Sequence, residues 1–372
     1  MSTIKVTNVN PPTAGNAVNI NGLAYPTAGP LSNRNLIING AMQVAQRGTT
    51  FTGGGGGGIT LDMWKFSEGT SAVFDVAQSS TAPAGFTTSF KVDCTTTGTP
   101  TGSQEAFVET KVEAQNLQHL QYGTSGAQTT TLSFWVRSNK TGDYGLWFYH
   151  YDLPGQYATT YTISSADTWE YKTITLPGNT TAAFANDNTT GLAIRFYLQI
   201  GPDLAGTPSE TWQTTLSNRS PDLNLGDSTS NEWLITGVQL EVGQVATPFE
   251  HRSFGDELLR CQRYYQKSYE YNTAPGTNTD NGKIYNYGSS EGASNIVSQI
   301  AATVAFRTSP TITWYTPGGT AGKWNSARNG SQSDVTMNSY QSGEKRISGY
   351  CALGAAWTVG YAQGHYEASA EL

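Results

Sequence analysis

Three segments of alternating sequence carry the side chains best suited to hold a ligand. In residues 132–137 apolar residues alternate with polar or aromatic ones, and residues 146–151 and 192–200 repeat this split. Successive side chains of a strand point to opposite faces, so each segment predicts an aliphatic core face and an outer face. The outer-face residues are Trp135, Arg137, Trp147, Tyr149, Tyr151, Arg195, Tyr197 and Gln199.

This outer face has the chemistry of a sugar site. Flat aromatic rings beside amide and guanidinium donors suit the apolar faces and the hydroxyls of sugars. We therefore interpret the eight residues as a candidate sugar-binding face of one sheet. A second interpretation stays open, because subunit interfaces are also enriched in Tyr, Trp and Arg. In that case the face packs on a neighbouring subunit or domain.

Histidine and serine are present without the spacing that catalysis or metal binding needs. The four histidines, His119, His150, His251 and His365, lie far apart and match no metal-ligand pattern. Residues 226–228, Gly-Asp-Ser, resemble the nucleophile block of one esterase family, but no Asp-x-x-His follows to supply the base. We expect no catalytic residue, no metal and no cofactor.

Carboxylates leave one enzymatic alternative open. Asp143, Asp152 and Glu170 lie near the ends of predicted strands. Each has an ordinary interpretation as a solvated turn residue, since charged side chains mostly stay exposed. Glycoside hydrolysis needs two carboxyl groups at a defined separation in space, which spacing along the chain does not reveal.

Composition excludes several classes of protein. Of 372 residues only 13% are charged, about half the usual share, and the net charge is −7. Without a Lys or Arg cluster the chain is a poor candidate for nucleic-acid binding. Three widely spaced cysteines provide neither a disulfide framework nor a zinc site. We also expect no membrane insertion and no signal peptide, because no apolar stretch is long enough.

The predicted elements indicate an all-β protein. Turn residues separate strands of period two, which is typical of a jelly-roll-like β-sandwich. Strands are predicted at 72–77, 106–112, 130–138, 144–151, 169–176, 191–200 and 232–242.

A helix and a second set of strands follow. Ser253 is a suitable N-cap for a helix that continues to about Lys267, with Leu258, Cys261 and Tyr265 on one face. Further strands are predicted at 296–306, 311–316, 347–353 and 355–372, with a Gly/Asn/Ser-rich loop around 317–334. The predicted organisation is an N-terminal arm (1–33), a jelly-roll β-sandwich (34–250), a linker helix (251–270) and a smaller C-terminal β-sandwich domain (271–372).

Two stretches that bracket the first domain resemble a known family. The first is residues 35–48, NLIINGAMQVAQRG, followed by Trp64. The second is residues 235–269, which contain GVQLE, ATPFE and CQRYY. Together they resemble a carbohydrate-binding-module-like jelly roll found in tail appendages of tailed bacteriophages.

The resemblance implies a homotrimeric tail fibre or receptor-binding spike in the virion tail appendage. It implies that residues 1–33 dock to phage tail or adaptor proteins and that the partner outside is bacterial surface polysaccharide. We expect that the protein is not an enzyme. Two alternatives stay open. One is a head-decorating or tail-scaffold fibre without a receptor role, and the other is a polysaccharide depolymerase.

Overall fold

The computed structural model describes residues 18–20, 23–25, 32–54, 58–151, 155–290, 295–328, 331–352 and 357–372. Two compact units make up the chain. The first comprises Met1–Gln43, Thr50–Ile59 and Trp64–Arg252, and the second comprises Val44–Thr49, Thr60–Met63 and Ser253–Leu372. Among the described residues no helix has the length and apolar character needed to cross a membrane.

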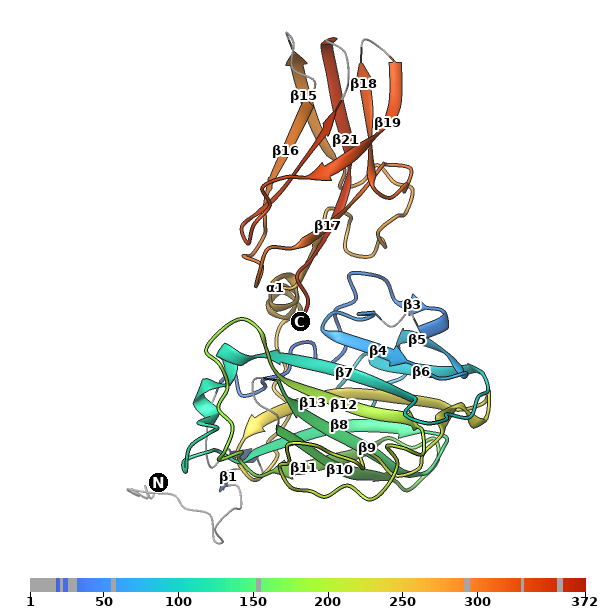
Figure 1. Ribbon diagram of the computed structural model, residues 1–372, viewed down its shortest axis with the longest axis vertical. Coiled ribbons are helices and arrows are strands. Elements are labelled where there is room, and N and C mark those ends of the chain that lie inside the picture. The colour runs from blue at the N-terminus through green and yellow to red at the C-terminus, as the bar shows by residue number, and fades with distance from the viewer. Residues whose placement is uncertain are drawn as a thin grey trace, which may run out of the picture. The chain divides into compact units, whose positions relative to one another are not determined.

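The first unit is a jelly-roll sandwich of two antiparallel sheets (Figure 1). Its strands are β3 (Thr50–Phe51), β4 (Trp64–Glu68), β5 (Val73–Ser79), β6 (Ser89–Thr96), β7 (Glu105–Glu113), β8 (Thr130–Ser138), β9 (Gly142–His150), β10 (Gly155–Ile163), β11 (Glu170–Leu176), β12 (Thr190–Ile200) and β13 (Glu232–Val242). One sheet has the order β10-β9-β12-β7-β4, and the other has the order β11-β8-β13-β6-β5-β3. Chain neighbours such as β8 and β9 therefore lie in different sheets.

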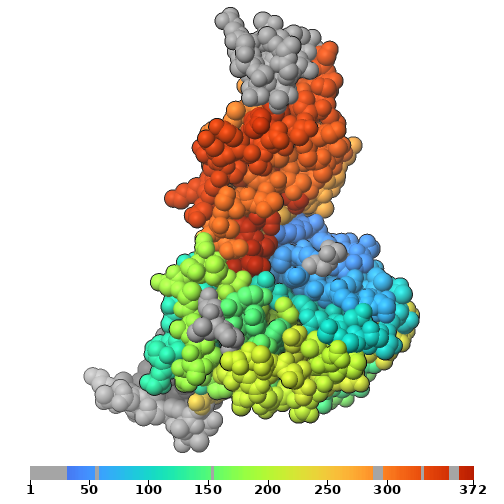
Figure 2. Space-filling model, in the orientation of Figure 1, coloured from blue at the N-terminus to red at the C-terminus, as the bar shows by residue number. Residues whose placement is uncertain are grey.

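Aromatic side chains from both sheets fill the space between them. The Phe134 ring of β8 meets the Phe196 ring of β12 at 5.2 Å, and Phe196 also lies 6.0 Å from Trp233 of β13. All three side chains are fully buried. Burying one such side chain stabilises the fold by about 1.5–3 kcal/mol. The space-filling view shows the residues of this unit, blue to yellow, as a closely packed body (Figure 2).

The two stretches that carry the family resemblance meet in space. Asn35 donates from Nδ2 to the Val238 carbonyl oxygen (3.0 Å) and accepts at Oδ1 from the Leu240 N–H (3.1 Å). The Asn35 N–H donates to Glu250 (3.0 Å), whose own N–H donates to Gln239 (2.8 Å). These motif residues thus join the beginning of the sandwich to its end, and their role here is structural.

The prediction of an all-β fold is confirmed. Each of the seven strands predicted for the first domain is present within a few residues of its expected bounds. Strands β3, β4, β6 and β10 were not predicted. In β10, for example, the sequence is GQYATTYTI, in which threonine occupies both faces and blurs the apolar alternation.

The second unit is organised around its last strand. Its strands are β14 (Tyr265–Lys267), β15 (Ile284–Ser290), β16 (Asn295–Ala301), β17 (Thr311–Tyr315), β18 (Lys323–Arg328), β19 (Ser331–Ser339), β20 (Arg346–Ala352) and β21 (Trp357–Ser369). The early part of β21 pairs with β15 and β18, and its later part pairs with β14 and β17. One long strand thereby ties four others together.

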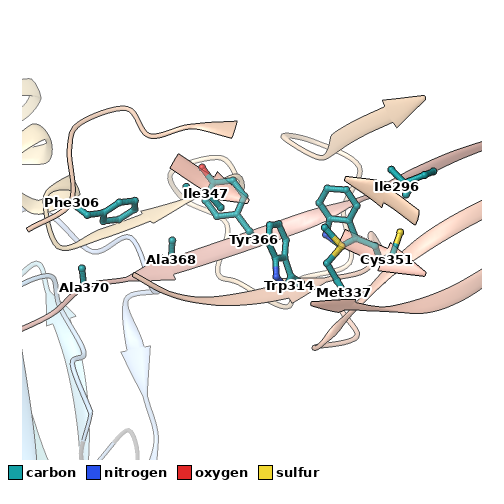
Figure 3. Close-up of a cluster of buried hydrophobic side chains, with 11 residues drawn as sticks. Ile296, Phe306, Trp314, Met337, Ile347, Cys351, Tyr366, Ala368 and Ala370 are labelled. Atoms are coloured by element: carbon teal, nitrogen blue, oxygen red, sulfur yellow. The ribbon is translucent and has the colours of Figure 1, made fainter. Parts of the chain in front are cut away.

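Two tryptophans belong to the buried core of this unit, and Figure 3 labels one of them, Trp314, among its neighbours. The rings of Trp314 and Trp324 meet edge to face at 5.4 Å. Met337, Cys351 and Ile347 belong to the same buried cluster. The Trp324 indole N–H donates to the His365 carbonyl oxygen (3.0 Å), so its polar group is satisfied inside the core.

The predicted helix forms but ends early. Helix α1 spans Phe254–Gln262, and the Ser253 hydroxyl accepts from the Asp256 N–H (3.1 Å) as an N-cap. The predicted continuation to Lys267 is wrong, because residues 265–267 pair with β21 as strand β14. Tyr265 is therefore buried on a strand and not on the helix face.

A second correction concerns the predicted loop around residues 317–334. Much of it is the hairpin β18–β19, in which Trp324 and Ala327 are buried. Strand β18 has the sequence KWNSAR, whose inward positions are marked by one tryptophan and small residues. Such a strand gives too little apolar alternation to be recognised from sequence.

Two short segments from the N-terminal part belong to the second unit, although the sequence analysis assigned them to the first domain. They are residues 44–49 and 60–63. Arg47 forms ion pairs with Glu371 (2.8 Å) and Asp62 (3.8 Å), which bind both segments to the C-terminal end of the chain.

Most of the predicted arm, residues 1–33, lies outside the described residues. Within it the structure describes a two-stranded hairpin of β1 (Val18–Ile20) and β2 (Leu23–Tyr25). Docking through this arm stays a prediction.

Candidate functional site

The eight predicted site residues do not share one sheet. Trp135 and Arg137 lie on β8 in the six-stranded sheet, whereas β9 and β12, with Tyr151 directly after β9, belong to the five-stranded sheet. The prediction of a single outer face is therefore wrong. Alternation along a strand indicates which residues share a face, but strand pairing with distant segments decides the sheet.

Trp135 and Arg137 belong to a separate patch on the outer face of the six-stranded sheet. The Trp135 ring, half-buried, lies 5.3 Å from the ring of Tyr171 on β11. Arg137 forms ion pairs with Asp167 (2.8 Å) and Glu232. Its donors are already engaged with carboxylates, so this patch offers a ligand mainly the Tyr171 ring, which is 43% exposed.

Trp147 and Tyr197 lie on the outer face of the five-stranded sheet but are covered. Their exposed fractions are 5% and 0%, and both belong to a buried cluster that includes Leu216 from the connection between β12 and β13. Burial raises the pKa of Tyr197. These two rings stabilise that connection and do not face a ligand.

Gln199 is absent from the outer face altogether. The register of β12 against β7 shifts between Tyr197 and Gln199, which is a β-bulge. One extra residue reverses the alternation, so Ile200 takes the outer position beside Tyr197. The Gln199 side chain is buried and donates to Gly98 O (2.8 Å) and Asn224 Oδ1 (2.7 Å).

Tyr149 and Tyr151 are the predicted aromatic residues of this sheet that remain accessible. Tyr149 is half-buried, Tyr151 is 40% exposed, and their rings meet edge to face at 4.6 Å. Lys111 of β7 places its Nζ 5.5 Å from the centre of the Tyr151 ring. We call Tyr149, Tyr151, Lys111 and Arg195 the Tyr149–Tyr151 patch.

An ion network holds Arg195 in this patch. Its Nε donates to Glu109 Oε2 (2.6 Å), and its Nη1 lies 3.5 Å from Glu105. The guanidinium also stacks over the rings of Phe107 (4.2 Å) and Trp147 (4.6 Å). Burial lowers the pKa of Arg195, but the two carboxylates outweigh burial and raise it, so the side chain stays cationic.

Burial also acts on the neighbours of Arg195. It raises the pKa of the Tyr151 hydroxyl, an effect to which Glu109 adds and which Arg195 opposes. It lowers the pKa of Lys111, although Glu109 at 3.6 Å favours the charged form. Lys111 and Glu109 were not among the predicted site residues. The sequence pattern could have identified them, because the predicted strand 106–112 places both on the outer face, opposite the apolar Val108 and Val112.

A groove runs beside β10, the edge strand of the five-stranded sheet. Its two adjoining parts have volumes of about 570 and 320 Å³, and Thr160 and Glu210 line both. Asp143 and Asp222 line the larger part. Glu210 accepts a hydrogen bond from the Thr159 hydroxyl (2.6 Å). We call this the β10 groove.

The carboxylates named from the sequence do not gather in one place. Asp143 lines the β10 groove, whereas Glu170 forms an ion pair with Lys172 (2.6 Å) and accepts from two backbone N–H groups. Burial raises the pKa of Glu170, but these partners outweigh it and lower the pKa. Asp152 lies outside the described residues. Across the described ranges, no group of three or more His, Cys, Asp or Glu side chains has a metal-binding arrangement.

The segment that resembles an esterase nucleophile block has local structural partners. Asp227 ends the short 3-10 helix η3 (Leu225–Asp227) and accepts from Asn231 Nδ2 (2.6 Å). It also forms an ion pair with Lys140 (2.5 Å). Ser228 accepts from the Ser230 N–H (3.2 Å). These contacts stabilise a turn before β13.

No protein-family model and no curated protein matches the chain. Several solved structures are similar to it. One is the enzymatically active domain of bacteriophage CBA120 tailspike protein 4, at 13% identity and a TM-score of 0.30, covering 56% of this chain and 21% of that chain. Another is an arabinose-bound α-L-arabinofuranosidase, at 13% identity and a TM-score of 0.31, covering 56% of this chain and 26% of that chain.

A carbohydrate-binding module is similar over its whole length. It is the family 11 module from Clostridium thermocellum in complex with a β-1,3-1,4-mixed-linked tetrasaccharide, at 8% identity and a TM-score of 0.27. The match covers 55% of this chain and 99% of the module, whereas the chain spans only about a quarter or less of the two enzyme chains. At these identities and TM-scores the matches assign no ligand to this protein.

Proposed function

We propose that this protein is a subunit of a bacteriophage tail fibre or receptor-binding spike that attaches the particle to polysaccharide on the bacterial surface. The observation that carries the proposal is the Tyr149–Tyr151 patch, in which an accessible ring pair lies beside two cations. The resemblance of residues 35–48 and 235–269 to tail-appendage jelly rolls supports the same conclusion.

Each part of the patch has a role in this proposal. The exposed face of Tyr151 contacts the apolar face of a sugar ring. Lys111 and the hydroxyl of Tyr149 donate to sugar hydroxyls or to a sugar carboxylate. Arg195, held by Glu109, keeps the ring pair in place and adds positive charge. One such site binds weakly, and several copies on one particle provide avidity.

A double substitution tests the patch. The Y149A/Y151A variant of the full chain is expected to bind an array of purified bacterial surface polysaccharides about tenfold more weakly, because it loses the stacking contact. Tyr171→Ala is the matched control, since Tyr171 is equally exposed on the other sheet. Equal binding by the double variant and the wild type, with thermal unfolding unchanged, contradicts the proposed site.

The same proposal includes a homotrimer docked to phage tail or adaptor proteins through residues 1–33. A native mass measurement that gives a monomer at micromolar concentration contradicts the trimer.

An adsorption assay distinguishes a receptor-binding role from a head-decorating or tail-scaffold role. The free protein blocks phage adsorption if it binds the receptor, and it leaves adsorption unchanged if its role is only structural.

One observation favours a second candidate function, polysaccharide hydrolysis. The β10 groove has three carboxylates, Asp143, Glu210 and Asp222, along its larger part. Glycosidases use a carboxyl pair on either side of the bond that they cleave. Release of reducing sugar from surface polysaccharide, abolished by Glu210→Gln, supports this function. If wild-type protein binds the polysaccharide and releases no sugar, hydrolysis is excluded for that substrate.

A further inference from the structure

The second unit presents an exposed group of tyrosines that the sequence analysis did not single out. Tyr285 and Tyr287 lie on β15, and Tyr361 lies on the adjacent strand β21. Tyr287 is 76% exposed, the largest exposure of any aromatic side chain in the described part of the chain, and Tyr285 is 37% exposed. Exposed aromatic surface of this kind marks a contact with some partner.

The three rings support one another. Tyr285 and Tyr361 stack with their centres 4.7 Å apart, and Tyr285 and Tyr287 lie 4.8 Å apart. Tyr287 is the direct cross-strand partner of Tyr361, with ring centres 6.2 Å apart. Because the rings are already held by neighbours, they lose little conformational freedom when a ligand binds.

Amide side chains continue this face across the neighbouring strands. Gln363 of β21 pairs with Asn325 of β18, and its Nε2 donates to Asn325 Oδ1 (3.4 Å). Gln332 of β19 donates from Nε2 to the Tyr361 hydroxyl (3.1 Å). Amides present both donors and acceptors at one position, as sugar hydroxyls require.

The charges around the face are paired locally. Lys283 forms an ion pair with Asp280 (2.8 Å). Asp334, on β19, accepts a hydrogen bond from Asn325 Nδ2 (3.2 Å). Lys283 Nζ also lies 5.6 Å from the centre of the Tyr285 ring. The tyrosine and amide side chains of the face are themselves uncharged, so they complement an uncharged ligand better than an anionic one.

We propose that the tyrosine–amide face, formed by Tyr285, Tyr287, Tyr361, Gln363 and Gln332, is a second carbohydrate-binding surface that takes a neutral oligosaccharide. The rings stack on sugar faces, and the amides exchange hydrogen bonds with hydroxyls. This goes beyond the proposed function of the Tyr149–Tyr151 patch, which lies on the other unit and includes the charged side chains of Lys111 and Arg195.

The composition of the face favours a sugar over a second copy of the chain. Three partly exposed tyrosines provide a few hundred Å² of contact. A stable protein–protein interface buries roughly 1,200 Å² or more around an apolar centre. No aliphatic side chain is among the five residues of the face, whereas a short run of sugar rings needs only rings and polar groups.

Affinity electrophoresis of the full chain tests the proposal. The probes are gels that contain neutral β-glucan, galactan or mannan. We expect at least one polysaccharide to retard the protein, and the Y285A/Y287A variant to bind it about tenfold more weakly, as loss of stacking requires. Tyr340→Ala is the matched control, because Tyr340 is 46% exposed and also lies in the second unit. No retardation by any of the three, or equal retardation of the variant, overturns the proposal.

Hydroxyl-radical footprinting distinguishes a bound polysaccharide from a second copy of the chain at the tyrosine–amide face. Protection of Tyr287 that appears only with polysaccharide supports the proposal. Protection that rises with protein concentration in the absence of polysaccharide identifies a second copy and overturns it. The two proposed sites fail independently, because Y149A/Y151A leaves the tyrosine–amide face intact and Y285A/Y287A leaves the Tyr149–Tyr151 patch intact.

Discussion

The outer sheet faces of the two units contain similar aromatic residues in opposite situations. In the first unit, Trp147 and Tyr197 are at most 5% exposed, because the connection between β12 and β13 packs over them. In the second unit, Tyr287 is 76% exposed on a face continued by amides. On the outer side of their strands, Trp147 and Tyr197 are therefore part of a core, whereas Tyr287 is open to solvent.

Coverage by a second layer decides the role of an outward ring. Covered rings contribute to stability, and uncovered rings are available for binding. Strand alternation is the same in both cases. Substitution of a covered ring should therefore cost stability, whereas substitution of an uncovered ring should leave stability nearly unchanged.

The largest expected effect comes from Trp147. We expect Trp147→Ala to destabilise the first unit by about 3 kcal/mol, because a large buried side chain is removed. Tyr287→Ala should change stability by less than about 0.5 kcal/mol, as exposed substitutions do. Denaturant unfolding followed by circular dichroism measures both. Equal effects would show that the connection between β12 and β13 does not cover Trp147 in solution.

Substitution of Arg195 should reduce the stability of the first unit by less than substitution of Trp147. Arg195→Met leaves the carboxylate of Glu109, which is only 2% exposed, without its closest cation. We expect a loss of about 2 kcal/mol, less than for a fully buried pair because Arg195 keeps some contact with solvent. The R195M/E109Q double variant should recover part of this loss, and a double-mutant cycle measures the coupling. Additive losses contradict the ion pair.

His365 should make the second unit sensitive to acid, with the smallest effect of the three. Its Nδ1 contacts the Ser268 hydroxyl (3.1 Å) and its Nε2 contacts the Thr279 carbonyl oxygen (3.0 Å), while burial lowers its pKa. The unfolded chain then takes up the proton first, so stability falls as the pH drops below the ordinary histidine value of about 6.5. The free energy of unfolding of a His365→Gln variant should depend less on pH across this range than that of the wild type. An unchanged pH dependence contradicts the role given to His365.

Local pattern was enough to predict most of the strands. Strands β8, β12 and β13 lie within one residue of their expected bounds, because apolar residues recur at alternate positions over most of their length. The N-cap Ser253 also predicted the beginning of α1. Its end was missed, since pairing of β14 with β21 depends on residues about a hundred positions away.

The candidate site was predicted only in part. Tyr149, Tyr151 and Arg195 lie together as expected, but Trp135 and Arg137 belong to the other sheet. Gln199 left the face through a bulge that alternation along β12 alone does not reveal. The tyrosine–amide face was missed because Tyr361, Gln332 and Gln363 come from strands that meet only in the folded unit.

The amino-acid sequence is sufficient to predict a β protein that is weakly charged and rich in aromatic and amide side chains, because strand alternation and composition are local properties. Which aromatic residues are covered depends on the folded chain, since outward placement on a strand does not reveal what packs over Trp147 and leaves Tyr287 exposed. Tertiary structure also decided that residues 44–49 belong to the second unit, where Arg47 meets Glu371. Sheet membership and coverage depend on contacts between distant segments, and those contacts exist only once the chain has folded.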